Sequence, residues 1–333
     1  MDKAKITDNM TSSEVVLGSE DLVSSKEVIG TEHSVEDKII TPLEKKTTKE
    51  TVKLEEEKEE QTDKPEIVIK SVVLPQEGKF ALVYSFKDPA GMNIAKKIQE
   101  LGVPKWAKLY EIDGDITETN LSKVKEDLII FLSKHQSEVG TKALTIHMIG
   151  NFGEAKFGGK GRELCGAMPR VGANYLRALN EKNISEGLSK QGFVVTMEAT
   201  HHGPFSRKDC LFIEIGSSAK EWKNDLAAKI VAEVVINETQ KENKDTIVIG
   251  LGGGHYTPEF TKLVLRQKYA FGHICAKHNL GELNLDLIWS MIRRSGADEI
   301  VLDWKGLKEN KERVIELTGI TKLKVHRVQN LLK

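Results

Sequence analysis

The chain has 333 residues, of which 39% are hydrophobic, 30% are charged and only 6% are aromatic. This length supports a substantial core in one large domain or two small ones. There is no signal peptide and no run of about 18 apolar residues, and the three cysteines (Cys165, Cys210 and Cys275) form no CxxC pair. These features exclude a helical membrane protein and a disulfide-rich secreted protein, and they predict a cytoplasmic protein.

Charge divides the chain near residue 75. Residues 1–75 carry 11 lysines and 18 acidic residues and contain no Phe, Tyr, Trp or Cys. Such a segment cannot bury enough apolar surface to offset the entropy lost on ordering, so we predict a disordered, charged extension. Residues 76–333 carry 38 basic and 32 acidic residues, and this mildly basic excess permits an RNA partner.

Strands and helices alternate along residues 76–333, which we expect to fold as one domain or as two lobes. Apolar runs bounded by turn residues predict strands at 80–85, 107–112, 143–149, 193–196, 210–215, 246–250, 269–276, 299–302 and 323–328. Helical spacing and capping residues predict helices at 88–101, 121–135, 173–190, 218–239, 284–294, one that begins at 257 and one that ends near 317. This alternation predicts an α/β fold with a largely parallel sheet.

The region around residues 194–218 is the strongest indication of a functional site. The strand at 193–196 stops at Thr-His-His-Gly-Pro, which places His201 and His202 on a tight turn between two strands. Side chains at strand ends are where a sheet presents chemistry. Glu198 precedes the turn and Glu214 lies in the following strand, so both carboxylates are expected near the histidines.

Two further histidines occupy similar positions. His255 follows a glycine run after one strand, and His273 lies beside Gly272 in another. If the carboxyl ends of the strands line one crevice, these imidazoles and Glu198 or Glu214 form a zinc site. The alternative is that each histidine is a hydrogen-bonded structural residue. His147, inside an apolar strand, is interpreted as a core histidine, and His135 carries no signal.

The sequence Gly250-Leu-Gly-Gly-Gly-His255 joins a strand to a helix. Backbone N–H groups in such a loop, including those of Gly253 and Gly254, suit a phosphate or a developing oxyanion. The loop is not a Walker A sequence, and His255 replaces the third glycine of a dinucleotide fingerprint, which argues against a nicotinamide dehydrogenase. A tightly packed glycine turn is the alternative.

Basic residues gather in the glycine-rich loop that spans residues 151–170. Together with aromatic Phe152 and Phe157 they are suited to contact RNA phosphates and to stack on bases, although an ordinary solvated loop has the same composition. The basic residues of this loop, with one that follows the double histidine, are Lys156, Lys160, Arg162, Arg170 and Arg207.

Several of these stretches together resemble a known family. They are Glu198-Ala-Thr-His-His-Gly-Pro204, Phe212-Ile-Glu-Ile-Gly-Ser217, Gly250-Leu-Gly-Gly-Gly-His-Tyr256, Gly272-His-Ile274 and Asp303-Trp-Lys-Gly306. Their order is similar to that of the archaeal and plant type of D-aminoacyl-tRNA deacylase, and the resemblance covers about residue 79 to the C-terminus. The acidic extension lies outside it.

The resemblance implies hydrolysis of the ester between a D-amino acid and the terminal adenosine of tRNA. It also implies zinc dependence and a three-layer α/β/α fold akin to peptidyl-tRNA hydrolases and phosphorylase-like hydrolases. The partner is then the acceptor end of D-aminoacyl-tRNA, with no DNA and no membrane, for a monomer or a small homo-oligomer. A zinc-dependent amino-acid or peptide hydrolase, and a non-catalytic RNA- or nucleotide-binding module, remain alternatives.

On this basis we assign hypothetical roles. Catalysis is assigned to Glu198, His201 and His202, with the N–H groups of Gly253 and Gly254 holding the oxyanion. The metal ligands are taken from His202, Glu214, His255 and His273. The tRNA contacts are assigned to Lys156, Lys160, Arg162, Arg170 and Arg207.

Overall fold

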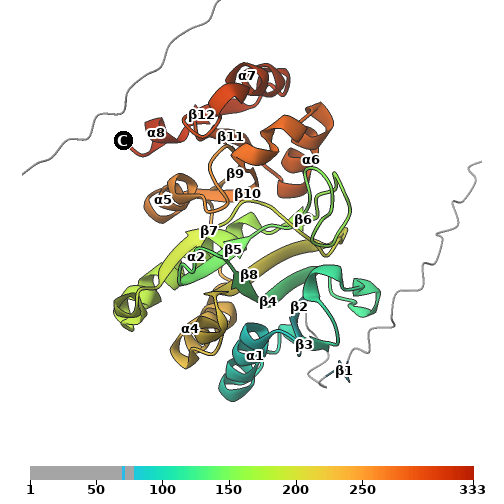
Figure 1. Ribbon diagram of the computed structural model, residues 1–333, viewed down its shortest axis with the longest axis vertical. Helices are drawn as coiled ribbons and strands as arrows, with labels where there is room; N and C mark the ends of the chain where they lie inside the picture. The colour runs from blue at the N-terminus through green and yellow to red at the C-terminus, as the bar shows by residue number, and fades with distance from the viewer. Residues whose placement is uncertain (1–69, 72–78) are drawn as a thin grey trace, which may run out of the picture. The chain divides into compact units, whose positions relative to one another are not determined.

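The computed structural model describes residues 70–71 and 79–333 (Figure 1). The predicted disordered extension over residues 1–75 lies outside the described residues, except for Lys70–Ser71, which form the short strand β1. Among the described residues, no helix is long and apolar enough to cross a membrane.

The first sheet has eight strands, and most of them are parallel. Its order is β1-β3-β2-β4-β8-β5-β7, and β6 also pairs with β8. β2, β3, β4 and β8 run in one direction, whereas β5 is antiparallel to β8 and β7 follows the direction of β5. The strands are β2 (Phe80–Ser85), β3 (Ala107–Ile112), β4 (Leu128–Gln136), β5 (Ala143–His147), β6 (Gly166–Ala167), β7 (Val194–Met197) and β8 (Asp209–Ser217).

The second sheet is fully parallel and has the order β10-β9-β11-β12. Its strands are β9 (Thr246–Leu251), β10 (Tyr269–Cys275), β11 (Glu299–Leu302) and β12 (Lys324–Arg327). Neighbouring side chains on β9 point to opposite faces, so Val248 packs towards α5 (Pro258–Arg266) and Ile249 towards α6 (Leu285–Ser295). Helices therefore cover both faces of this sheet.

The two faces of the first sheet are covered differently. One face packs against α1 (Pro89–Leu101), α2 (Pro169–Ser185) and α4 (Asp225–Glu238), which lie together on one side of the strands in Figure 1. The other face holds Val83, Phe131 and Phe212 beneath loop residues such as Ile116 and Val124. The expected α/β fold with a mixed, largely parallel sheet is confirmed, and the loop-covered face is the one that carries the polar cluster described below. The remaining helices are α3 (Ala219–Trp222), α7 (Lys311–Ile320) and α8 (Val328–Leu331).

A short segment after β7 joins the two sheets. The Ala199 N–H donates to the His255 carbonyl at 2.8 Å, and the Thr200 N–H donates to the Ile274 carbonyl at 2.9 Å. The chain around Glu198 is therefore fixed between the end of β7 and the loop that follows β9. This junction fixes the position of the loop after β9 relative to the segment after β7.

One predicted helix is wrong. Residues 121–135 do not form a helix; they form a single 3-10 turn at Leu121–Lys123 and then the strand β4. The run from Leu128 to Leu132 includes two β-branched residues and lies between β2 and β8, where both faces of the sheet are covered. A strand buried on both faces needs apolar residues at every position, and this run then matches helical spacing by coincidence.

The capping predictions are more accurate. Asp88 caps α1 by accepting from the N–H groups of Ala90 and Gly91, as the Asp-Pro pair predicts. The long helix predicted at 218–239 is interrupted, because Asn224 caps a second helix, α4, two residues after α3 ends. The helix predicted at 173–190 begins at Pro169 and ends at Ser185.

Candidate functional site

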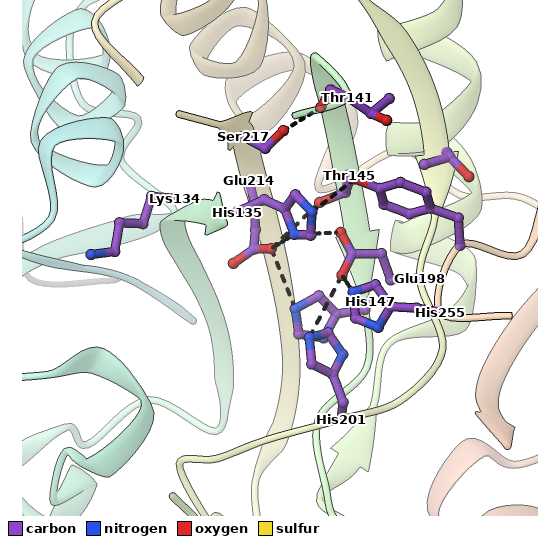
Figure 2. Close-up of polar contacts among 12 residues, drawn as sticks. Lys134, His135, Thr141, Thr145, His147, Glu198, His201, Glu214, Ser217 and His255 are labelled. Atoms are coloured by element: carbon purple, nitrogen blue, oxygen red, sulfur yellow. Dashed lines mark hydrogen bonds and ion pairs between the residues drawn. The ribbon is translucent and has the colours of Figure 1, made fainter. Parts of the chain in front are cut away.

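Seven polar side chains meet on the loop-covered face of the first sheet, and Figure 2 labels all of them except His202. We call them the histidine–glutamate cluster; they are His135, His147, Glu198, His201, His202, Glu214 and His255. They come from the end of β4, the end of β5, the segment after β7, the middle of β8 and the loop after β9. The cluster thus unites residues that are up to 120 positions apart in the chain.

Glu198 lies at the centre of this cluster and is fully buried. Its Oε1 is 3.0 Å from His135 Nδ1, and its Oε2 is 3.0 Å from His255 Nε2 and 3.6 Å from His201 Nε2. Within the described part of the chain, no hydrogen-bond donor is aligned with either oxygen. A buried carboxylate without aligned donors is costly unless positive charge lies beside it.

Glu214 bridges two other histidines from the middle of β8. Its Oε2 is 3.6 Å from His135 Nδ1 and 3.7 Å from His147 Nε2, and the Thr145 hydroxyl donates to it at 3.4 Å. Because β5 is antiparallel to β8, Thr145 pairs directly with Glu214 and His147 with Phe212. The mixed sheet thus brings the end of β5 to the face of β8.

Three histidines share one hydrogen-bond arrangement. The Nδ1–H groups of His147, His201 and His202 donate to the carbonyls of Met148, Ala199 and Gly203, at 3.1, 2.8 and 2.6 Å respectively. The ring centroids lie 4.2 to 4.8 Å apart. A carbonyl accepts only from a protonated Nδ1, so this pattern leaves the Nε2 atom of each ring for another partner.

Burial and charge shift the pKa values of the cluster in opposite directions. Burial alone raises the pKa of a carboxyl group, yet the neighbouring histidines outweigh it and hold the pKa values of Glu198 and Glu214 below their usual range. Burial lowers the pKa of His202 to about 4, with His147 adding to the effect. Burial also lowers the pKa values of His135 and His147, but the carboxylates of Glu214 and Glu198 outweigh the effect of burial, so both pKa values lie above their ordinary value.

The donor set matches what a transition metal requires. Ligand atoms of His147, His201 and His202 lie within 4.8 Å of one another, and so do those of two further groups, His135–Glu198–His255 and His147–Glu198–Glu214. The Nδ1–H contacts to carbonyls are those that orient metal-binding imidazoles, and His147 Nε2 is buried without a hydrogen-bond partner among the described residues. Zinc is typically held by such nitrogen and oxygen atoms.

His273 lies outside the cluster. Although His273 was expected to bind metal, its Nδ1 contacts the Thr200 hydroxyl at 3.1 Å and its Nε2 the Cys165 carbonyl at 3.0 Å, which leaves neither nitrogen for a metal. Burial lowers the pKa of His273 to about 4. His273 therefore fits the other interpretation that the sequence left open, a hydrogen-bonded structural histidine.

The glycine loop packs tightly against residues 303–306. A Cβ on Gly252 would lie 2.8 Å from the Asp303 carbonyl oxygen, and one on Gly306 would lie 2.3 Å from the Gly253 nitrogen. The Gly252 N–H donates to the Cys275 carbonyl. Gly253 and Gly254 do not line the cavity beside the cluster. Close packing therefore accounts for Gly252, and an oxyanion role for the N–H groups of Gly253 and Gly254 stays a prediction.

A cavity of about 650 Å³ opens beside the cluster, and we call it the central cavity. The residues that line it include five members of the cluster, the segments 114–117 and 133–136, and Phe157. The five cluster members are His135, His201, His202, Glu214 and His255. This volume lies within the range of about 300–1,000 Å³ that is usual for ligand sites. A ligand in the cavity would contact the imidazoles directly.

The predicted tRNA-contacting residues occupy different environments. Lys156 and Arg207 are exposed, and Lys160 Nζ lies 4.7 Å above the Phe205 ring. Arg162 is held by the Glu282 carboxylate at 2.9 Å and by the Glu282 carbonyl. Arg170 lies on α2, where its Nε donates to the Asp245 carbonyl beside the start of β9, at the opposite end of that strand from His255.

Sequence reasoning missed His135, His147 and Tyr256. His135 was hidden by the wrong helix prediction, and His147 by its apolar strand. Tyr256 supports the site because its hydroxyl lies 2.8 Å from His135 Nε2. Two signals were present: the buried run Leu128–Leu132 favours a strand that ends near His135, and His147 lies just before Gly150 at a strand end.

Comparison with known proteins gives consistent matches. A family model described as D-aminoacyl-tRNA deacylase matches residues 122–326, a range that includes the whole cluster. A D-aminoacyl-tRNA deacylase of Archaeoglobus fulgidus is 36% identical over 274 residues, which cover 74% of this chain and 97% of that protein. One from Methanococcus maripaludis is 35% identical over 246 residues, which cover 71% and 94%. The crystal structure of AF0625, a conserved protein of unknown function, aligns with a TM-score of 0.71 and 30% identity over 78% of this chain and 98% of that one.

Proposed function

The chain belongs to the D-aminoacyl-tRNA deacylase family, and we propose that the histidine–glutamate cluster is where it hydrolyses its substrate. The protein is a hydrolase that cleaves the ester bond of D-aminoacyl-tRNA and releases the free D-amino acid and tRNA, which removes D-amino acids from the translation machinery. The observation that carries the assignment of the site is Glu198, a fully buried carboxylate in contact with three imidazoles, His135, His201 and His255, that line a ligand-sized cavity.

We propose zinc as the cofactor. The residues that would hold it are His147, His201 and His202 through their Nε2 atoms, with Glu214 supplying an oxygen ligand. Of the four ligands expected from sequence, this set keeps His202 and Glu214. Zinc, when bound, polarises a carbonyl group and lowers the pKa of water. The buried His147 Nε2 without a partner and the three Nδ1–carbonyl contacts support this proposal.

The proton transfers are assigned to side chains around Glu198. Attack of water on the ester carbonyl forms a carbon–oxygen bond and releases one proton, which Glu198 accepts. Collapse of the tetrahedral intermediate breaks the bond to the ribose oxygen, which needs a proton. His255 donates it, because its Nε2 lies 3.0 Å from Glu198 and its side chain is 45% exposed at the cavity. Tyr256 and Glu214 hold His135 beside Glu198 as a compensating positive charge.

Recognition of the acceptor end is assigned to the loop beside the cavity. Lys156, Lys160 and Arg207 are exposed, and they are proposed to contact phosphates. Lys156 Nζ lies 3.9 Å from the exposed Glu154 carboxylate, and Lys160 Nζ lies over the Phe205 ring. Discrimination between enantiomers is proposed to arise where the cavity leaves no space for an L side chain. A tRNA substrate and three free, buried cysteines agree with a cytoplasmic location.

The decisive experiment measures release of D-tyrosine and L-tyrosine from charged tRNA before chelation, after chelation, and after zinc is added back. We expect hydrolysis of the D ester alone, loss of activity on chelation, and recovery with zinc. D-specific activity that survives chelation would contradict the zinc proposal and keep the deacylase. Hydrolysis of neither ester, or equal hydrolysis of both, would contradict the proposed function.

A further inference from the structure

Phe157 is an exposed aromatic residue at the edge of the central cavity. Its side chain is 73% exposed, although it lines the same cavity as His201, His202 and His255. Phe152, the other aromatic residue of this loop, is buried in the core around α6. Single exposed apolar side chains are common on protein surfaces, so the position of Phe157 at the cavity, and not its exposure alone, indicates a role in binding.

The loop holds Phe157 in a fixed position. The Phe157 carbonyl accepts from the Gly203 N–H at 3.1 Å, which ties it to the turn that carries His202. The next residue, Gly158, has φ +77°, and a Cβ there would lie 2.0 Å from the Thr117 carbonyl oxygen. The Asn151 side chain donates to the Gly158 carbonyl at 3.0 Å. The backbone that carries the ring is thus packed on both sides, and binding of a ligand needs to order only the side chain of Phe157.

The surroundings of the ring match a nucleotide. Lys156 precedes it and Lys160 lies three positions after it, and both lysines are exposed, so the loop that carries the ring also offers positive charge. Bases stack on aromatic side chains while basic residues hold the adjoining phosphates. In an aminoacyl-tRNA only the ribose separates the ester from the terminal base, so a stacking surface for that base must lie next to the reacting groups.

We infer that the Phe157 ring is the platform on which the terminal base of the tRNA acceptor strand stacks. This inference rests on the proposed function, which places the ester at the imidazoles. It assigns the edge of the cavity to the nucleotide and leaves the interior, beside His135 and the segment 133–136, for the amino acid. The competing occupant of the Phe157 surface is the side chain of the amino acid itself.

The first test compares the kinetics of Phe157→Ala on tRNA charged with D-alanine and with D-tyrosine. Stacking on one base predicts that KM rises by about 5- to 140-fold, by the same factor for both esters, while kcat changes little. Phe157→Trp should retain wild-type KM. Phe86→Ala is the matched control, because Phe86 is 41% exposed and does not line the cavity; it should leave both constants unchanged. An unchanged KM in Phe157→Ala, or a rise for D-tyrosine alone, would overturn the inference.

The second test does not depend on catalysis. Affinity is measured for uncharged tRNA and for the same tRNA with an abasic terminal residue, using the wild type and Phe157→Ala. Stacking predicts that loss of the base weakens binding to the wild type by about 5- to 140-fold and weakens binding to the variant little further. Equal losses in both proteins would overturn the inference. Should the wild type hydrolyse neither ester, the proposed function would fall, and this binding cycle would still decide whether the base stacks on Phe157.

Discussion

Replacing Glu198 with glutamine removes the charge at the centre of the cluster with almost no change in shape. The carboxylate contacts His135 through Oε1 and His255 through Oε2, each at 3.0 Å. An amide offers one oxygen and one NH2 group, so it can serve as acceptor for only one of these imidazoles. It also cannot take a proton from water at neutral pH. The variant therefore loses the proposed base and one of the two contacts that orient the histidines.

The size of the effect follows from these two losses. A positioned acid or base contributes about 100- to 10,000-fold to a rate. At about 1.36 kcal/mol for each factor of ten, this corresponds to about 2.7 to 5.4 kcal/mol of activation free energy. We expect kcat for release of D-tyrosine from D-tyrosyl-tRNA to fall within this range. KM should change by less than about threefold, because Glu198 is buried and acts mainly in the transition state.

The assay follows acid-soluble D-tyrosine from labelled D-tyrosyl-tRNA, with thermal unfolding measured in parallel. Glu100→Gln, an exposed carboxylate on α1, is the control and should be indistinguishable from the wild type. A folded Glu198→Gln protein that keeps more than about a third of the wild-type kcat would refute the reasoning. If the variant does not fold, His255→Ala removes the same 3.0 Å contact from the exposed side, and its kcat should fall at least about 10-fold.

Three further predictions test other parts of the molecule. His202→Ala should lower kcat/KM for D-tyrosyl-tRNA by about 100-fold or more; unimpaired turnover would remove His202 from the site. Asp88→Ala should lower the free energy of unfolding by about 2 kcal/mol or more in urea titrations. The reason is that Asp88 caps α1 and also accepts from the backbone N–H of Lys134, next to His135. A loss below about 0.5 kcal/mol would contradict this prediction. Glu126 Oε1 lies 2.6 Å from Lys108 Nζ, and its Oε2 accepts from the Tyr110 hydroxyl. Burial raises the pKa of Glu126, but these two partners outweigh the effect of burial and hold the pKa below the ordinary value of 4.5. The carboxylate therefore stabilises the fold above pH 4.5, and this contribution is lost as the pH falls through the folded-state pKa. Glu126→Gln should be about 1–2 kcal/mol less stable than the wild type at pH 7 and nearly equal to it in acid. A difference in unfolding free energy that does not change with pH would contradict this prediction.

The sequence determined the elements whose signals are local. Asp88 followed by Pro89 predicts the start of α1, and Ser218 with Glu221 predicts the start of α3, because caps depend on residues within one turn. The sequence also indicated the site through His201, His202 and the nearby Glu198, because a strand followed by a tight turn can be predicted from a few residues. The order of several short motifs was enough to indicate the family.

Tertiary structure alone decided which histidines meet. His135 and His147 join the cluster because β4 and β5 both lie next to β8, and because β5 runs against β8, which places Glu214 between the two rings. His273 also lies on a strand, yet that strand belongs to the second sheet, and both of its ring nitrogens are hydrogen-bonded. Strand order and direction are set by burial of apolar faces across the whole chain, and no local pattern records them. For this reason the residues of β4 read as a helix in sequence, while in the folded protein they carry a histidine into the site.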